Sequence, residues 1–450
     1  MLPLIARLTA IDEARLQRIL AIGVPIIGGM LSQSLINLID AAMVGRLGEQ
    51  ALAAVGIGSY ASFIVVSTVM GLASGVQALV ARRFGAGDSA RMGHTFIAGL
   101  LLAVLMGVPL TAFFLTISPW LIPWFNATPN VVEVAIPYFD WRTLAVTFVA
   151  INFVFRGFWS GIGESRMYLK VLLLMHLANI GISYVLIFGI GHWAGMGAVG
   201  SGIGTAASLA LGSLMYAWLT FRRHSARLPD WRWPSRHELL TLARLALPNS
   251  TQQTLFALGT SVMFWIIGQI GTQQQAIGHI LISLALVLIL PAVGLGIAST
   301  SLVGQALGRE QQQDAYRWGW EVVRLAMLVM ALVGLPLWLF PEWILRLFTP
   351  DEHLIELGTW PLRISGLAIG LEVVAMVLTQ ALLGAGASRQ VLKINLVMQW
   401  LVLLPLAYLL GPVAGLGLLG IWLLQGLQRI ALSAIYTVIW RSQHWARIRL

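Results

Sequence analysis

Long apolar stretches alternate with short polar segments along the whole chain. A membrane-spanning helix needs about 20 predominantly apolar residues, and twelve stretches of the 450-residue chain meet that requirement. The first six lie near residues 19–44, 53–80, 94–118, 131–160, 168–189 and 195–221. The second six lie near residues 240–270, 276–304, 315–340, 354–384, 392–411 and 416–440. The pattern predicts an all-α polytopic membrane protein with twelve transmembrane helices.

The two sets of six helices are predicted to be copies of one unit. Matching residues 223 positions apart include Pro25 with Pro248, Gly71 with Gly294, Gly161 with Gly384 and Lys170 with Lys393. The last two pairs belong to a shared GxGxSR segment and the lysine that follows it. Because each copy has six spans, both copies have the same orientation and are related by a pseudo-twofold axis along the membrane normal.

The repeat predicts the domain organisation. Residues 1–221 form an N-terminal six-helix lobe and residues 240–450 form a C-terminal six-helix lobe. A polar, basic linker at residues 222–239 joins them and is predicted to be cytoplasmic. Two such lobes facing each other across a central cavity suit alternating access around a site at the repeat interface.

Composition and charge support a membrane protein and predict its orientation. The chain is 58% hydrophobic and 10% charged, whereas soluble domains carry roughly 25% charged residues. The net charge of +10 comes from lysine and arginine in every second loop, and such loops face the cytoplasm. Both termini are therefore predicted to be cytoplasmic, and the basic balance does not indicate nucleic-acid binding. The absence of cysteine excludes disulfides and thiol chemistry.

One carboxylate lies late in the first predicted span. Asp40 stands in the segment NLIDAAMVG, and Gln33 and Asn37, earlier on the same helix, are predicted to line the substrate cavity. An aspartate in hydrocarbon costs on the order of 3 kcal/mol, so it should face a wet cavity or polar partners. Burial favours the protonated carboxyl, which makes Asp40 a candidate proton carrier or a hard-oxygen ligand for a cation. The alternative is a structural hydrogen bond at the membrane edge.

A second carboxylate, Glu372, lies deep in the tenth predicted span. No cation lies within a helical turn of it, so a local ion pair is not expected. The repeat mate of Glu372 is Val149, and that of Asp40 is Met263. Neither carboxylate therefore belongs to the shared scaffold, and each lobe has its own. We predict a functional role for Glu372, with a structural or lipid-edge role as the alternative.

Uncharged polar residues mark further candidate positions. Asn179 and Ser183 are four residues apart on one face of the fifth span. They are predicted to supply oxygens near Asp40, together with Ser201 or Thr205 of the sixth span. Interhelical hydrogen bonds between small polar residues are the alternative. In the second lobe, the predicted cavity residues are Gln252, Gln253, Gln380 and Gln399.

Motifs of common enzyme classes are missing from the sequence. The eight histidines show no HExxH spacing, and no GxxxxGK[ST] segment is present. An intramembrane enzyme would need clustered carboxylates or histidines, whereas Asp40 and Glu372 lie in different predicted lobes. The chain is therefore not expected to be an enzyme, and no cofactor is expected beyond a coupling ion.

Three segments resemble parts of one known family. Residues 24–56, VPIIGGMLSQSLINLIDAAMVGRLGEQALAAVG, resemble the first two spans of a MATE (multidrug and toxic compound extrusion) transporter. Residues 291–310 and the segment LLGAGASR at 382–389 are similar to that family's span-eight and span-ten motifs. The resemblance covers nearly the whole chain. It implies two six-helix lobes around a substrate cavity, with export driven by sodium or proton entry.

The resemblance also implies roles for single residues, with a mixture of DinF-like and NorM-like features. Asp40 matches the coupling carboxylate of the first lobe, Pro25 the proline where that helix bends, and Asn179 the span-five asparagine of the same site. Ser183 stands where DinF-like members carry a second aspartate. Glu372 matches the span-ten carboxylate of NorM-like members, while Phe256 stands near their span-seven glutamate. Each known cation site is thus represented only in part.

The function implied is a multidrug efflux antiporter. It would export amphipathic, often cationic organic compounds or drugs by alternating access, as a monomer in the inner membrane of a prokaryote. Proton coupling through Asp40 is favoured, and a sodium ion near Asp40 or Glu372 is the alternative. A lipid-linked precursor flippase of the same superfamily is the rival function, but its diphosphate would need several deep cations. The candidates Arg142, Arg156, Arg324 and Arg429 are expected near helix ends.

Overall fold

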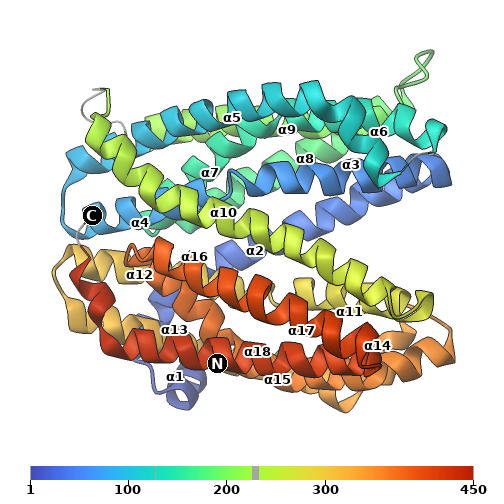
Figure 1. Ribbon diagram of the computed structural model, residues 1–450. Coiled ribbons are helices and arrows are strands. Elements are labelled where there is room, and N and C mark those ends of the chain that lie inside the picture. The colour runs from blue at the N-terminus through green and yellow to red at the C-terminus, as the bar shows by residue number, and fades with distance from the viewer. Residues whose placement is uncertain (1, 127, 225–232, 449) are drawn as a thin grey trace. The chain divides into compact units, whose positions relative to one another are not determined.

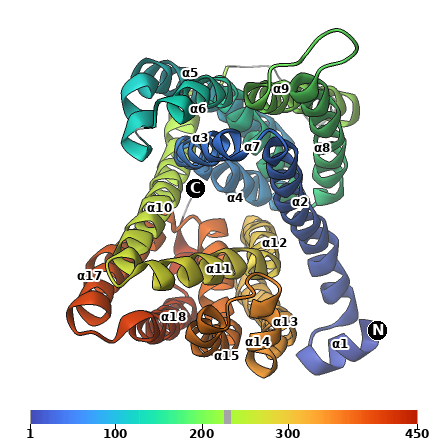
Figure 2. The ribbon, with the colours of Figure 1, turned by 90° about the vertical axis from the view of Figure 1, so that its right-hand side faces the viewer.

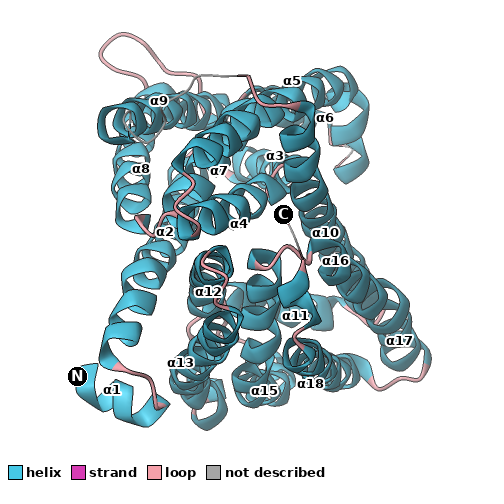
Figure 3. Cartoon of the chain, turned by 90° about the vertical axis from the view of Figure 1, so that its left-hand side faces the viewer, coloured by secondary structure: helices cyan, strands magenta, loops and turns pink. Residues whose placement is uncertain are grey.

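The computed structural model describes residues 2–126, 128–224, 233–448 and 450 of the chain, and their regular elements are all helices (Figures 1 and 3). The first half contains α1 (Leu2–Thr9), α2 (Glu13–Gly45), α3 (Glu49–Ser67), α4 (Gly71–Gly85), α5 (Ser89–Phe125), α6 (Pro129–Leu144), α7 (Val146–Gly161), α8 (Ser165–Phe188) and α9 (Ala198–His224). The second half contains α10 (Arg236–Gly268), α11 (Thr272–Leu288), α12 (Leu290–Gly308), α13 (Gln312–Leu339), α14 (Pro341–Arg346), α15 (Glu352–Gly384), α16 (Ser388–Leu396), α17 (Leu404–Tyr408) and α18 (Gly417–Ser442). Two π-helical segments, η2 (Val397–Leu403) and η3 (Leu409–Val413), flank α17, and a 3-10 turn, η4 (His444–Arg447), ends the helical order.

The helices match the predicted membrane spans. In the described part of the chain, ten helical stretches are long and apolar enough to cross a membrane. An eleventh consists of α6 and α7, which are bent by 41° where they meet. Helix α10 takes the place of the seventh predicted span, and its polar run at 249–254 (NSTQQT) makes it less apolar than the others. The prediction of an all-α membrane protein with twelve transmembrane helices is confirmed.

Packing divides the chain into two compact units whose limits differ from the predicted lobe boundaries. The N-unit is Gly28–Thr254, and the C-unit is Met1–Ile27 together with Leu255–Leu450. The first part of α2 thus packs with the second repeat, and the first part of α10 packs with the first repeat (Figure 2). The sequence repeat shows which segments of the chain match each other, whereas the units show which segments pack together in the structure. Residues 225–232 of the predicted linker 222–239 lie outside the described residues.

Two repeat-related glycines receive these exchanged helix parts. In the N-unit, Gly71 at the start of α4 lies directly against the carbonyl oxygen of Ala246 in α10. Its backbone N–H also donates to Ser250 Oγ at 3.0 Å. In the C-unit, Gly294 of α12 lies directly against Ile27 of α2. A side chain at either glycine would occupy the space of the neighbouring helix, which explains why the repeat has glycine at both positions.

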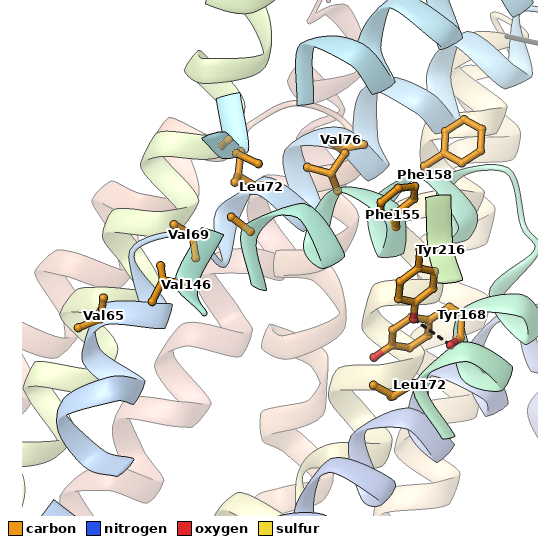
Figure 4. Close-up of a cluster of buried hydrophobic side chains, with 14 of the residues drawn as sticks. Val65, Val69, Leu72, Val76, Val146, Phe155, Phe158, Tyr168, Leu172 and Tyr216 are labelled. Carbon is orange, nitrogen blue, oxygen red and sulfur yellow. Dashed lines mark hydrogen bonds between the residues drawn. The ribbon is translucent and has the colours of Figure 1, made fainter. Parts of the chain in front are cut away.

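An aromatic and aliphatic core fixes the position of α8 in the N-unit (Figure 4). Tyr216 of α9 stacks between Phe155 of α7 and Tyr168 of α8, with ring-centroid distances of 5.5 and 6.5 Å. Its hydroxyl donates to the Tyr168 backbone oxygen at 3.0 Å. Leu172, one turn further along α8, belongs to the same core. Side chains that follow Leu172 on α8 are therefore held by a rigid support.

Candidate functional site

Helices α2 and α8 run parallel and side by side within the N-unit. Gly29 lies directly against Tyr168, and Ser32 Oγ lies 2.6 Å from His176 Nδ1, while Val44 and Ile187 belong to one cluster of buried side chains. Asp40 lies four residues before Val44, and Ser183 lies four residues before Ile187. Asp40 and Ser183 therefore each lie about one helical turn before a residue of that cluster.

A string of four hydrogen-bonded side chains connects the two helices. Ser32 Oγ lies 2.6 Å from His176 Nδ1, and the other ring nitrogen, Nε2, lies 3.3 Å from Gln33 Oε1. Gln33 Nε2 donates to Asn37 Oδ1 at 3.2 Å. His176 is buried, whereas Gln33 and Asn37 are exposed. The string ends three residues before Asp40.

Asp40 is a half-buried carboxylate with an unsatisfied oxygen. Its Oδ1 atom is shielded from solvent and has no hydrogen-bond partner among the described residues. Arg142 of α6 is the charged group whose field acts on Asp40. An unpartnered carboxylate oxygen in a low-dielectric interior is costly, so this atom is suited to take up a proton or a cation.

The polar residues of α8 and α9 meet at a tight helix interface. Asn179 is buried and donates from Nδ2 to Thr205 Oγ1 and to Ser208 Oγ, each at 3.3 Å. Gly204 of α9 lies directly against Ser183. The interhelical hydrogen bonds considered as the alternative for Asn179 are thus present. They use its nitrogen and leave its oxygen free.

Four buried oxygens of this region have no hydrogen-bond partner in the described part of the chain. They are Asp40 Oδ1, Asn179 Oδ1, Ser183 Oγ and Ser201 Oγ. Carboxylate, amide and hydroxyl oxygens are the donors that hard cations prefer, and a carboxylate can instead hold a proton. Among the described residues, no group of three or more His, Cys, Asp or Glu side chains forms a metal site. The four oxygens are of the kinds that can hold a proton or a hard cation.

Glu372 has no cation within a helical turn, as expected, but it is ion-paired with an arginine of another helix. Its Oε2 atom accepts from Arg429 Nη1 of α18 at 2.7 Å, and the exposed fractions of the two side chains are only 12% and 23%. Arg429 lies 57 residues away in sequence, so a search within one helical turn could not find it. The ion pair makes Glu372 a poor candidate for a free cation ligand.

The expected position of Arg429 near a helix end is wrong. Arg429 lies in the middle of α18 and not near a helix end, whereas Arg142 lies in the last turn of α6, next to the bend of the α6–α7 pair. Each one acts on the carboxylate of its own unit, Arg429 on Glu372 and Arg142 on Asp40. A carboxylate and an arginine on separate helices thus occur together in both units.

The four glutamines predicted to line a cavity of the second lobe do not all belong to the same packing unit. Gln252 and Gln253 belong to the N-unit, because this part of α10 packs with the first repeat. Gln380 of α15 packs against α12, where its Oε1 accepts from Thr300 Oγ1 at 3.4 Å. Gln399 of η2 reaches α10 and donates to the Phe256 carbonyl at 3.5 Å. Gln252 Oε1 is buried and has no hydrogen-bond partner among the described residues.

Pro25 lies near the point where α2 passes from one unit to the other. It stands inside the helix and is buried, two residues before the last C-unit residue of that segment, Ile27. Proline removes a backbone hydrogen bond and weakens a helix locally. The predicted hinge at Pro25 therefore lies close to the end of the part of α2 that belongs to the C-unit.

Sequence reasoning missed two residues of these sites, His176 and Arg429. A signal for His176 was available, because it lies three residues before Asn179 on the same helix and seven before Ser183. At helical spacing these three residues share one face. No comparable signal existed for Arg429, whose partner is brought to it by the packing of α15 and α18.

Comparisons with known proteins agree with this architecture. The family model described as MatE matches residues 25–185 and 248–409. Probable multidrug resistance proteins NorM of Thermotoga maritima and of a Synechococcus species are 26% and 29% identical, covering 96% and 92% of this chain and 93% and 91% of theirs.

Solved structures share the fold. A structure described as the outward-facing conformation of a multidrug resistance MATE family transporter has a TM-score of 0.88 at 24% identity, covering 96% of each chain. A MATE structure in the bent conformation has a TM-score of 0.88 at 23% identity, covering 97% of each chain. The two matches of the family model begin at Pro25 and Pro248, which are repeat mates, and together they span most of both repeats. The chain therefore belongs to the MatE family of membrane transporters.

Proposed function

We propose that this chain is a secondary active multidrug efflux antiporter that exchanges amphipathic, cationic organic compounds for protons. The observation that carries the proposal is the Oδ1 atom of Asp40, inside α2, which is buried and has no partner among the described residues. Family membership supports export, since relatives are described as multidrug resistance proteins. Glu372 is already neutralised by Arg429, so Asp40 is the better coupling residue.

The proposed cycle uses the change in charge at Asp40. Protonation from the outer side removes a negative charge from the N-unit and weakens the attraction of that unit for a cationic compound, which is released outward. Loss of the proton towards the cytoplasm restores the negative charge and the affinity. The ion gradient drives the cycle, and the membrane potential adds about 2.3 kcal/mol per charge per 100 mV.

The proposal includes orientation and assembly. The positive-inside distribution of lysine and arginine supports an inner-membrane protein of a prokaryote with both termini in the cytoplasm. We propose that the transporting unit is a monomer, because one chain contains both units and the helices that pass between them.

Transport by purified protein in liposomes tests the proposal. We expect an imposed pH gradient alone to drive efflux of a fluorescent organic cation such as ethidium, and Asp40→Asn to lower that efflux at least about 100-fold. Glu372→Gln should keep proton dependence, even if its rate falls. Undiminished gradient-driven efflux by Asp40→Asn would remove Asp40 from the coupling mechanism. Efflux driven by a sodium gradient and not by a pH gradient would replace the proton with sodium.

A further inference from the structure

His176 is the only buried histidine among the described residues. It lies on α8, one turn after the core residue Leu172, and faces α2 through hydrogen bonds from both ring nitrogens. No residue role implied by the sequence or by the coupling proposal uses it. A buried imidazole is costly to maintain unless both nitrogens are satisfied, and here each has a polar partner.

We infer that His176 receives the coupling proton from Asp40. His176 lies closer than Asp40 to the side of the membrane that is predicted to be cytoplasmic. The inference rests on the proposed proton coupling. In this step the O–H bond of protonated Asp40 breaks and an N–H bond forms at Nδ1 of His176. The products are a carboxylate and an imidazolium, and water carries the proton between them. The proton then leaves Nδ1 for water on the inner side.

The partners of His176 suit both protonation states of the ring. With Gln33 Oε1 as its acceptor, Nε2 keeps its proton in the neutral and in the charged form. Ser32 Oγ, 2.6 Å from Nδ1, can donate to the neutral ring and accept from the imidazolium after one rotation of its hydroxyl. A fixed N–H donor at this position would allow only the neutral form. The serine therefore makes Nδ1 the nitrogen that can exchange a proton.

The charges around His176 single out Asp40 as its counterpart. Helix α8 packs against α7, α9 and α2. The titratable or charged groups within these helices in the N-unit are Asp40 on α2, Arg156 on α7, Tyr216 on α9, and Tyr168, Lys170 and Tyr184 within α8, besides the arginines at the ends of α8 and α9. Asp40 is the only carboxylate among them, so it is the group that an imidazolium at position 176 would favour in its charged form.

The distance between Asp40 and His176 suits proton transfer through water molecules rather than direct proton transfer. Gln33, which contacts His176, lies seven residues before Asp40, or about 10 Å along the helix. Gln33 and Asn37 lie between the two groups, are exposed, and are hydrogen-bonded to each other at 3.2 Å. Exposed amide groups at this spacing can hold the water molecules that a proton needs to cross such a distance.

The test is His176→Gln in the same liposome assay. Glutamine can donate to Gln33 and accept from Ser32, but it cannot be protonated near neutral pH. We expect proton-driven ethidium efflux to fall at least about ten-fold and to lose its dependence on inner pH. Ethidium binding without a gradient should stay unchanged. The matched control is His279→Gln, because His279 is an exposed histidine of α11, and this variant should keep the wild-type profile.

Failure of the inference is distinguishable from failure of the proposed function. If His176→Gln keeps the rate and pH profile of His279→Gln while Asp40→Asn is inactive, His176 carries no proton and coupling through Asp40 stands. If Asp40→Asn is as active as wild type, both ideas fail. Should His176→Gln not fold, Ser32→Ala provides the second test, because it leaves the imidazole but removes the partner of Nδ1. An unchanged pH profile in Ser32→Ala would overturn the inference.

Discussion

Asp40 in the N-unit and Glu372 in the C-unit both lie in membrane helices, but their surroundings differ. In the N-unit, Asp40 has an oxygen that is buried and unpartnered within the described residues. In the C-unit, Glu372 is held by Arg429 at 2.7 Å. A carboxylate bonded to an arginine has its charge balanced by that partner, whereas an unpartnered carboxylate oxygen can still take up a proton or a cation. The repeated scaffold therefore supports two different surroundings for a carboxylate, one without and one with a bonded arginine.

The largest expected effect comes from breaking the C-unit ion pair. Arg429→Ala leaves the buried Glu372 charge without its partner, and such changes cost about 3–5 kcal/mol. Replacing both residues with apolar ones, as in Glu372→Leu with Arg429→Met, should cost much less, because no buried charge remains. Denaturant or thermal unfolding in detergent measures both changes.

A surface ion pair provides the control for this prediction. Arg346 and Glu352 are 3.2 Å apart, but the exposed fractions of their side chains are 54% and 73%. Exposed pairs contribute at most about 1 kcal/mol, so Arg346→Ala should change stability little. Equal losses in Arg429→Ala and Arg346→Ala would show that the buried pair has no special importance.

An intermediate effect is expected at the two glycines that receive the exchanged helices. Gly71→Ala and Gly294→Ala each insert a methyl group where another helix already lies, and overpacking of this kind costs about 1–3 kcal/mol. Similar losses at both positions would show that the scaffold is equivalent in the two units even though the carboxylates differ. The control is Gly56→Ala in α3, where nothing lies within 4 Å. A loss at only one of the two glycines would contradict an equivalent scaffold.

The smallest expected change in stability is that of Asp40→Asn. The substitution removes a partly desolvated charge and breaks no ion pair, so the free energy of unfolding should stay within about 1 kcal/mol of wild type or rise. Efflux should nevertheless be lost. A destabilisation as large as that of Arg429→Ala would mean that Asp40 is a structural residue after all, and would remove the contrast between the units.

Most of the fold was predictable because its determinants are local or periodic. Each apolar stretch is long enough to define its own helix, and the 223-residue offset pairs Gly71 with Gly294 without any structure. The unit boundaries were not predictable in the same way. The segment before Ile27 resembles any other part of a first span, and only its packing shows that it belongs with the second repeat.

The site was predictable to the extent that its residues share one helix. Gln33, Asn37 and Asp40 lie on one helix, and the structure adds the hydrogen bond between the first two. Contacts between helices were harder to foresee, because any of several helices can supply the partner. Arg429 reaches Glu372 from another helix, and the link between His176 and Gln33 joins residues 143 positions apart.

The exchange of helix parts bears on how such a protein can arise. A single six-helix repeat, made alone, would have no helix to pack against Gly71. Its N-terminal helix segment would also have no packing partner. Two separate copies would each pack a helix segment against a glycine of the other copy. Such an exchange of identical segments gives a domain-swapped dimer. Joining the copies in one polypeptide turns that association into an intramolecular one and raises the effective concentration of the partner. Once fused, the two copies were free to diverge, and Asp40 and Glu372 record that divergence.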